Sequence, residues 1–165
     1  MVLLRILSVA ALISAAASAQ IVLGDVGFQV LGQGGTAGAF CRGFDCRPAT
    51  LGVLRGETLT ITVRAPQGAA YALVAALSAS SCTPVPGIWH ELALDAPLFP
   101  LRAGTVSQSS PILSCYDGFE NIALSIPNAL PSGSALALQA AAMVGTPIAP
   151  NAGTALATPV VIIAR

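Results

Sequence analysis

The sequence predicts an all-β protein, a single antiparallel β-sandwich of immunoglobulin-like or jelly-roll-like type with about seven or eight strands. Two observations lead to this prediction. Sixteen glycines and twelve prolines divide the 165 residues into short segments. Several of these segments alternate apolar and polar residues, the period of two that places one face of a strand against a core. The length fits one domain, and a hydrophobic content of 55% excludes intrinsic disorder, because such a chain can bury enough apolar surface to fold.

The first nineteen residues have the features of a cleaved export signal. Arg5 is followed by the apolar stretch Ile6–Ala16 and by the small residues Ala17-Ser18-Ala19. The apolar stretch is shorter than the ~20 residues of a spanning helix. We therefore expect a signal peptide over residues 1–19 and a β-sandwich domain over 20–165, exported to the cell surface, the periplasm or the medium. No membrane span is predicted in the mature chain, since prolines interrupt its apolar runs.

The first apolar segment of the domain, Val26–Leu31, precedes Gly32-Gln33-Gly34-Gly35-Thr36-Ala37. This pattern matches the G-x-G-x-x-A of dinucleotide-binding proteins, in which a helix follows the glycines. Here a stretch rich in glycine and cysteine follows instead. We predict a glycine turn and no cofactor.

The next segments form the clearest predicted strands. Thr58–Val63 alternates strictly, and Ala65-Pro66-Gln67-Gly68 has the residues of a turn. Residues 70–77 are expected to return antiparallel to it. One face of that strand would carry Tyr71, Leu73 and Leu77. A further strand is predicted through Ile88, Leu92 and Leu94.

Three strands are predicted in the C-terminal part. Ile122, Leu124 and Ile126 alternate up to Pro127-Asn128; a second alternating set comprises Leu136, Leu138, Ala140 and Ala142; and Val160–Ile163 forms the last strand. Segments 69–79 and 135–144 are rich in alanine and leucine, so helices are the alternative there. We predict strands, because both segments lack helix caps.

The C-terminal half resembles a module found in exported, largely uncharacterised bacterial proteins. The resemblance rests on Leu124-Ser125-Ile126-Pro127-Asn128, the loop after it, and Leu136-Ala137-Leu138-Gln139-Ala140, an "IPN…LQA" hairpin before a final apolar strand. It covers roughly residues 51–163. It implies export and a β-rich fold, and it implies no activity.

Four cysteines, Cys41, Cys46, Cys82 and Cys115, predict two disulfides in an exported chain. Of the three connectivities, we favour Cys41–Cys46, which closes a tight loop, with Cys82–Cys115, whose members flank predicted turns. Zinc is disfavoured, because no C-x-x-C spacing and no nearby histidine accompany them.

The number and distribution of charged residues exclude nucleic-acid binding but are compatible with self-association. Seven arginines and seven acidic residues give a formal net charge of zero, and the arginines are scattered rather than clustered. Nucleic-acid binding needs a basic stripe. A surface with so few ions has weak electrostatic protection against self-association.

Few residues are candidates for catalysis. His90 is the single histidine, and Leu94 stands where an H-E-x-x-H zinc motif needs its second histidine. The chain has no G-x-S-x-G segment to present a serine nucleophile. A hydrolase would therefore have to use His90 as its base together with a carboxylate. A glycosidase would instead need two carboxylates flanking one bond, for which Asp95 with Asp117 or Glu120 are the candidates. The sequence predicts no enzyme, no catalytic residue and no metal.

The candidate ligand surface comprises Trp89, Tyr116, Asp117 and Glu120. Trp89 and Tyr116 could form an aromatic platform for a sugar. The densest group of oxygen ligands for a calcium ion is Asp117-Gly118-Phe119-Glu120-Asn121. An Asp-Gly turn before a strand explains this group more simply. We expect an exported, non-catalytic structural or interaction protein that associates with itself or with surface polysaccharide. The alternatives are a carbohydrate-binding module using Trp89 and Tyr116, and a hydrolase using His90.

Overall fold

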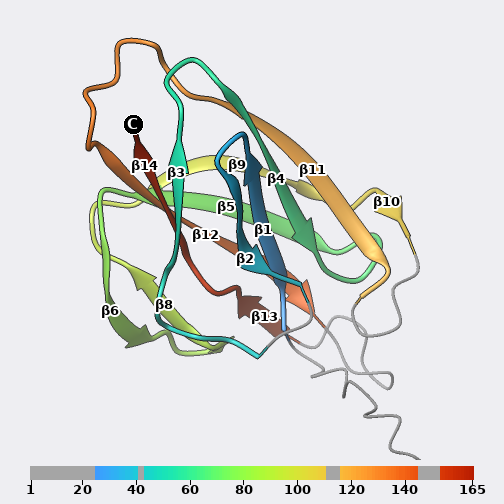
Figure 1. Ribbon diagram of the computed structural model, residues 1–165. Helices are drawn as coiled ribbons and strands as arrows, with labels where there is room; N and C mark the ends of the chain where they lie inside the picture. Colours follow the sequence, from blue (N-terminus) through green and yellow to red (C-terminus); the bar gives the residue numbers. More distant parts are fainter. Residues whose placement is uncertain (1–24, 41–42, 111–115, 145–152) are drawn as a thin grey trace, which may run out of the picture.

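The computed structural model describes residues 25–40, 43–110, 116–144 and 153–165. These residues contain no helix and form fourteen strands in two packed sheets and a two-stranded ribbon (Figure 1). The strands are β1 (Gly27–Gly32), β2 (Gly35–Ala39), β3 (Ala49–Val53), β4 (Thr58–Arg64), β5 (Ala70–Ala76), β6 (Ala79–Pro84), β7 (Ile88–Trp89), β8 (Glu91–Leu94), β9 (Phe99–Thr105), β10 (Gln108–Ser109), β11 (Gly118–Ser125), β12 (Ala135–Val144), β13 (Gly153–Leu156) and β14 (Val160–Ala164).

The predicted β-sandwich is confirmed, but the predicted number of strands is wrong. The segment through Ile88 and Leu94, for example, is divided at His90 into β7 and β8. The predicted signal peptide, Cys41 and Cys115 lie outside the described residues. In the part of the chain that the structure describes, no helix has the length and apolar character needed to cross a membrane.

The first sheet has the strand order β10-β11-β4-β1-β2, with every pair antiparallel. The predicted glycine turn is the β1–β2 hairpin, in which Gly32 faces Gly35. Strict alternation in β4 gives the predicted result, because Leu59, Ile61 and Val63 are fully buried. A buried carboxylate, Glu57, accepts backbone hydrogen bonds from Gln33 (2.9 Å) and Leu54 (2.7 Å) and so ties this hairpin to the turn before β4.

The second sheet is built around β12. On one side β12 pairs with β5, and on the other with β14 and then β13 along its length. Strand β9 pairs with β5 at the outer edge. Both Ala-rich segments are therefore strands, as predicted. Two parallel pairs, β3 with β14 and β7 with β13, depart from the expected antiparallel arrangement.

Two predicted hairpins instead connect the two sheets. Strands β4 and β5 belong to different sheets, and so do β11 and β12, which carry the "IPN…LQA" residues. Turns form at both predicted positions, but each turn connects strands of different sheets across the core and not neighbouring strands of one sheet. Crossing places the apolar faces of consecutive strands opposite each other, so that Ile61 of β4 and Leu73 of β5 share one core.

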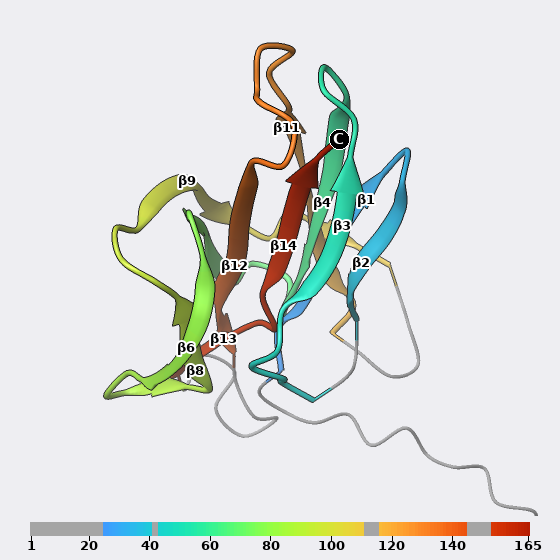
Figure 2. The ribbon, with the colours of Figure 1, turned by 60° about the vertical axis from the view of Figure 1, so that its left-hand side comes forward.

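The β6–β8 ribbon forms a third layer on the outer face of the second sheet (Figure 2). A small apolar cluster of Ala76, Leu94 and Ala137 joins ribbon and sheet. Strand β12 is consequently buried on both faces, and Gln139 is only 1% exposed. The predicted face of β5 is correct for Tyr71 and Leu73 but wrong for Leu77, which follows the end of the strand and is 65% exposed.

Candidate functional site

Trp89, His90 and Glu91 lie at the break between β7 and β8. His90 has a φ of 69°, a left-handed conformation that few residues other than glycine adopt. Three consecutive side chains thereby reach three different surroundings. Trp89 is 40% exposed, His90 meets Asp25, and Glu91 approaches two sulfur atoms. Backbone strain of this kind concentrates at functional sites, so we take this break as the centre of the candidate site.

His90 forms an ion pair with Asp25, whose Oδ1 lies 2.7 Å from the histidine Nε2. The imidazole also stacks on Phe44, with ring centroids 4.8 Å apart. Burial raises the pKa of Asp25, and the charge of His90 partly offsets that effect. The adjoining cavity, lined by Asp25, Phe44 and Thr158 among others, measures about 10 Å³ and holds at most one water molecule. The pair thus has the geometry of an acid–base dyad beside a cavity of about the size of one water molecule.

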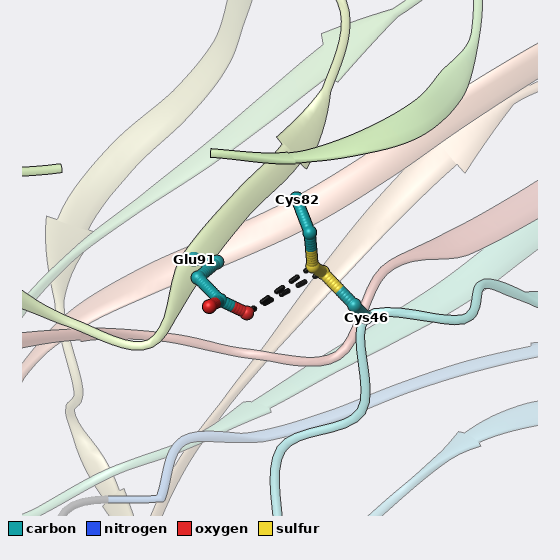
Figure 3. Close-up of side chains that lie close together, drawn as sticks. All are labelled: Cys46, Cys82 and Glu91. Carbon is teal, nitrogen blue, oxygen red and sulfur yellow. Dashed lines mark hydrogen bonds between the residues drawn. A yellow bond between two sulfur atoms is a disulfide. The ribbon is translucent and has the colours of Figure 1, made fainter. Parts of the chain in front are cut away.

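Cys46 and Cys82 form a disulfide with Cα atoms 6.0 Å apart, and Glu91 faces both sulfurs (Figure 3). The predicted pairs Cys41–Cys46 and Cys82–Cys115 are therefore wrong. Proximity in sequence suggested the first pair and turn positions the second. In the fold, however, the connection between β2 and β3 carries Cys46 to the β6–β8 ribbon, which contains Cys82. The bridge anchors that ribbon to the sandwich.

The Gln139 side chain forms hydrogen bonds that fix the backbone around Glu91. Its side-chain nitrogen donates to the carbonyl oxygens of Glu91 (3.1 Å) and Ala157 (2.9 Å), and its oxygen accepts from the Ala93 amide (3.1 Å). Sequence reasoning assigned Gln139 only to a hairpin pattern. A glutamine among alanines in a predicted strand was the available signal, since a buried amide needs hydrogen-bond partners.

The predicted ligand surface is divided among separate surroundings. Trp89 is exposed on β7 of the second sheet, whereas Tyr116 packs against the core and its carbonyl accepts a hydrogen bond from Arg64 (3.2 Å). Asp117 accepts from the Ser109 hydroxyl (3.4 Å), and Glu120 from the Ser107 hydroxyl (2.6 Å) and amide. Each carboxylate thus has its own local partner along β10 and β11. The predicted Asp117-Gly118 turn is not formed, because Gly118 is already the first residue of β11 and pairs with Ser109.

Asp95, the third acid considered for catalysis, follows β8 and accepts hydrogen bonds from the hydroxyls of Ser78 (2.7 Å), Ser80 (2.9 Å) and Ser81 (2.8 Å). The Ser78 hydroxyl, followed by those of Ser81 and Ser80, lowers the pKa of Asp95 to about 2. These donors favour the charged carboxylate, so Asp95 is suited to holding the start of the ribbon and not to donating a proton in a reaction near neutral pH.

We expect the Asp95 carboxyl to titrate near pH 2 in an NMR titration. Because its folded pKa lies below 3.8, the ordinary value for an aspartate, the contribution of Asp95 to stability is complete above pH 3.8 and is lost as the pH falls toward 2. The stability difference between the wild type and Asp95→Asn should shrink over the same interval. Replacing Ser78 by alanine should raise the Asp95 pKa. A wild-type Asp95 pKa close to 3.8 would show that the serines do not hold the carboxylate.

Comparison with known proteins adds no functional assignment. None of the protein-family models matches the chain, and no curated protein matches it in sequence.

Proposed function

We propose that this chain is an exported, non-catalytic interaction protein that assembles with copies of itself through the edge strand β9. The carrying observation is the exposure of that strand. Every residue of β9 is exposed, including Phe99 (44%) and Leu101 (40%). Leu98, just before the strand, and Leu77, just after its partner β5, add further exposed apolar side chains.

Strand β9 is an edge strand whose register shifts at Leu101, a residue without a counterpart in β5. It pairs with β5 and lies at the outer margin of the second sheet, away from the first sheet (Figure 2). An edge strand presents unpaired N–H and C=O groups to any strand that approaches, and apolar side chains on it add to the attraction. Clusters of exposed apolar side chains commonly mark interaction sites.

A second copy is the partner that the composition favours. Without the predicted signal peptide the chain keeps six arginines and seven acidic residues, a formal net charge of −1, so its copies repel one another only weakly. Arg102 is the one charged residue in β9. In a symmetric antiparallel pair centred on Leu101, Arg102 would face Pro100 of the other copy, and the two arginines would not lie directly opposite each other. Pro100 is compatible with an edge position.

The sequence and the disulfide support export, whereas the local pairing of the acids supports the absence of catalysis. A disulfide such as Cys46–Cys82 is typical of oxidising compartments outside the cytosol. A glycosidase needs two carboxyl groups that flank the same bond. Here Asp25 is paired with His90, Asp95 with three serines and Glu120 with Ser107.

We expect sedimentation velocity over a concentration series to show reversible dimerisation that Leu101→Lys weakens at least tenfold, because lysine on an edge strand opposes pairing. The matched control is Leu54→Lys, which changes an equally exposed leucine on the turn between β3 and β4 and should leave the association unchanged. A wild type that stays monomeric, or two variants with equal effects, would refute the assignment to β9.

A carbohydrate-binding role is the second candidate, favoured by the exposure of Trp89 near the stacked rings of Phe44 and His90. Exposed tryptophan faces stack well on apolar faces of ligands. Tyr116 packs against the core, so Trp89 would carry most of the binding. A glycan-array screen separates the two functions, since saturable binding that requires Trp89 favours this one.

A further inference from the structure

We propose that reduction of the Cys46–Cys82 disulfide converts this bridge, together with Glu91, into a three-ligand site for Zn²⁺. One atom from each residue, the two Sγ atoms and a carboxylate oxygen, lies within 4.8 Å of the others. The three residues come from two parts of the chain, the β2–β3 connection and the β6–β8 ribbon.

The distances from the carboxylate fit a tetrahedral ion. Glu91 Oε2 lies 3.2 Å from Cys82 Sγ and 3.7 Å from Cys46 Sγ. Zinc binds thiolate at about 2.3 Å and carboxylate at about 2.0 Å, which places sulfur and oxygen roughly 3.5 Å apart around one tetrahedral centre. Two thiolates on the same ion would be about 3.8 Å apart, a modest opening for cysteines whose Cα atoms are separated by 6.0 Å.

The Glu91 carboxylate can serve as a metal ligand once the disulfide is reduced. Disulfide sulfurs carry no proton, so neither can donate a hydrogen bond to the carboxylate that faces them (Figure 3). Two thiolates and one carboxylate are a donor set that zinc accepts, and the ion would neutralise most of their combined negative charge. Gln139 donates a hydrogen bond to the backbone carbonyl of Glu91. The backbone that carries the third ligand is therefore fixed before the metal binds.

A phosphine can supply the two electrons that reduction of the Cys46–Cys82 disulfide requires. The phosphine and one water molecule become a phosphine oxide, while the disulfide gains two electrons and two protons to give two thiols. Binding of Zn²⁺ then breaks the two S–H bonds and releases both protons, because thiolate is the ligand. Three protein ligands leave the fourth tetrahedral position to water, the arrangement of an open zinc site.

The first test uses Co²⁺ as a spectroscopic substitute for Zn²⁺ in the exported chain with Cys41 and Cys115 replaced by serine. After phosphine reduction we expect one equivalent of Co²⁺ to bind with thiolate-to-metal absorption, and the oxidised protein to show none. Glu91→Gln should weaken Zn²⁺ binding, measured by competition against Co²⁺, at least tenfold. Glu120→Gln, a carboxylate on β11, is the control and should change nothing. Absence of the thiolate absorption, or equal affinity of both variants, would overturn the proposal.

A second measurement keeps all four cysteines, in case the double-serine chain does not fold. The reduced full chain is alkylated with and without Zn²⁺, and each cysteine is read by mass spectrometry. We expect Zn²⁺ to slow alkylation of Cys46 and Cys82 at least tenfold, and more than that of Cys41 and Cys115. Equal protection of all four, or no protection of Cys46 and Cys82, would contradict the site.

Discussion

Replacing Cys46 and Cys82 together by alanine is expected to lower the free energy of unfolding by about 4 kcal/mol. The bridge closes a loop across a sequence separation of 36 residues, and the loop-entropy model gives about this value for a loop of that size. That loss is a large part of the ~5–15 kcal/mol that stabilises a typical domain. Denaturant unfolding of the oxidised wild type and the variant, followed by fluorescence or circular dichroism, measures the difference.

Peptide mapping without reduction is the control for this prediction. It should recover a peptide that links Cys46 to Cys82. With these two joined, Cys41 and Cys115 have only each other as intramolecular partners, and we expect them to be linked. Recovery of Cys41–Cys46 or Cys82–Cys115, or an unchanged unfolding midpoint in the double-alanine variant, would contradict the role given to the bridge.

Gln139→Leu should destabilise the protein by about 3 kcal/mol or more. Leucine is similar in size, so the loss is one of hydrogen bonding. The substitution leaves the carbonyls of Glu91 and Ala157 and the amide of Ala93 without their partner in a buried position. Each unsatisfied buried backbone group costs about 1–3 kcal/mol. Urea unfolding with a shared m-value provides the measurement.

Met143→Ala is the matched control for Gln139→Leu. Met143 belongs to the same strand, β12, but is 36% exposed, and its truncation should change stability by about 0.5 kcal/mol or less. If Gln139→Leu were as stable as this control, the three hydrogen bonds would not be what holds β8 and β12 together.

Local patterns were sufficient to predict the strands of the core. The alternation in Thr58–Val63 is a property of six adjacent residues, and it is satisfied by any sheet that buries one face. The same holds for β12, where the lack of helix caps outweighed the helix preference of alanine. Which sheet each strand joins was not predictable in this way, because a turn such as Ala65–Gly68 serves equally for a hairpin and for a crossing between sheets.

The candidate site was predicted only in part, since its contacts join distant residues. His90 and Glu91 lie within the strand predicted through Ile88 and Leu94, yet their partners Asp25 and Cys46 lie far away in sequence. The error in disulfide pairing has the same origin. Sequence spacing measures how short a loop is, whereas pairing depends on which strand ends the fold brings within about 6 Å. The exposure of β9 likewise follows from its place at the edge of the second sheet.

Hydrogen–deuterium exchange at two protein concentrations tests the central proposal, association through β9, most directly. We expect the amides of Phe99 and residues 101–105 to exchange more slowly at the higher concentration, because pairing with a second copy would protect them. The edge strand β10, in the first sheet, should exchange equally at both concentrations. Exchange in β9 that does not depend on concentration, or protection confined to another edge, would contradict the account.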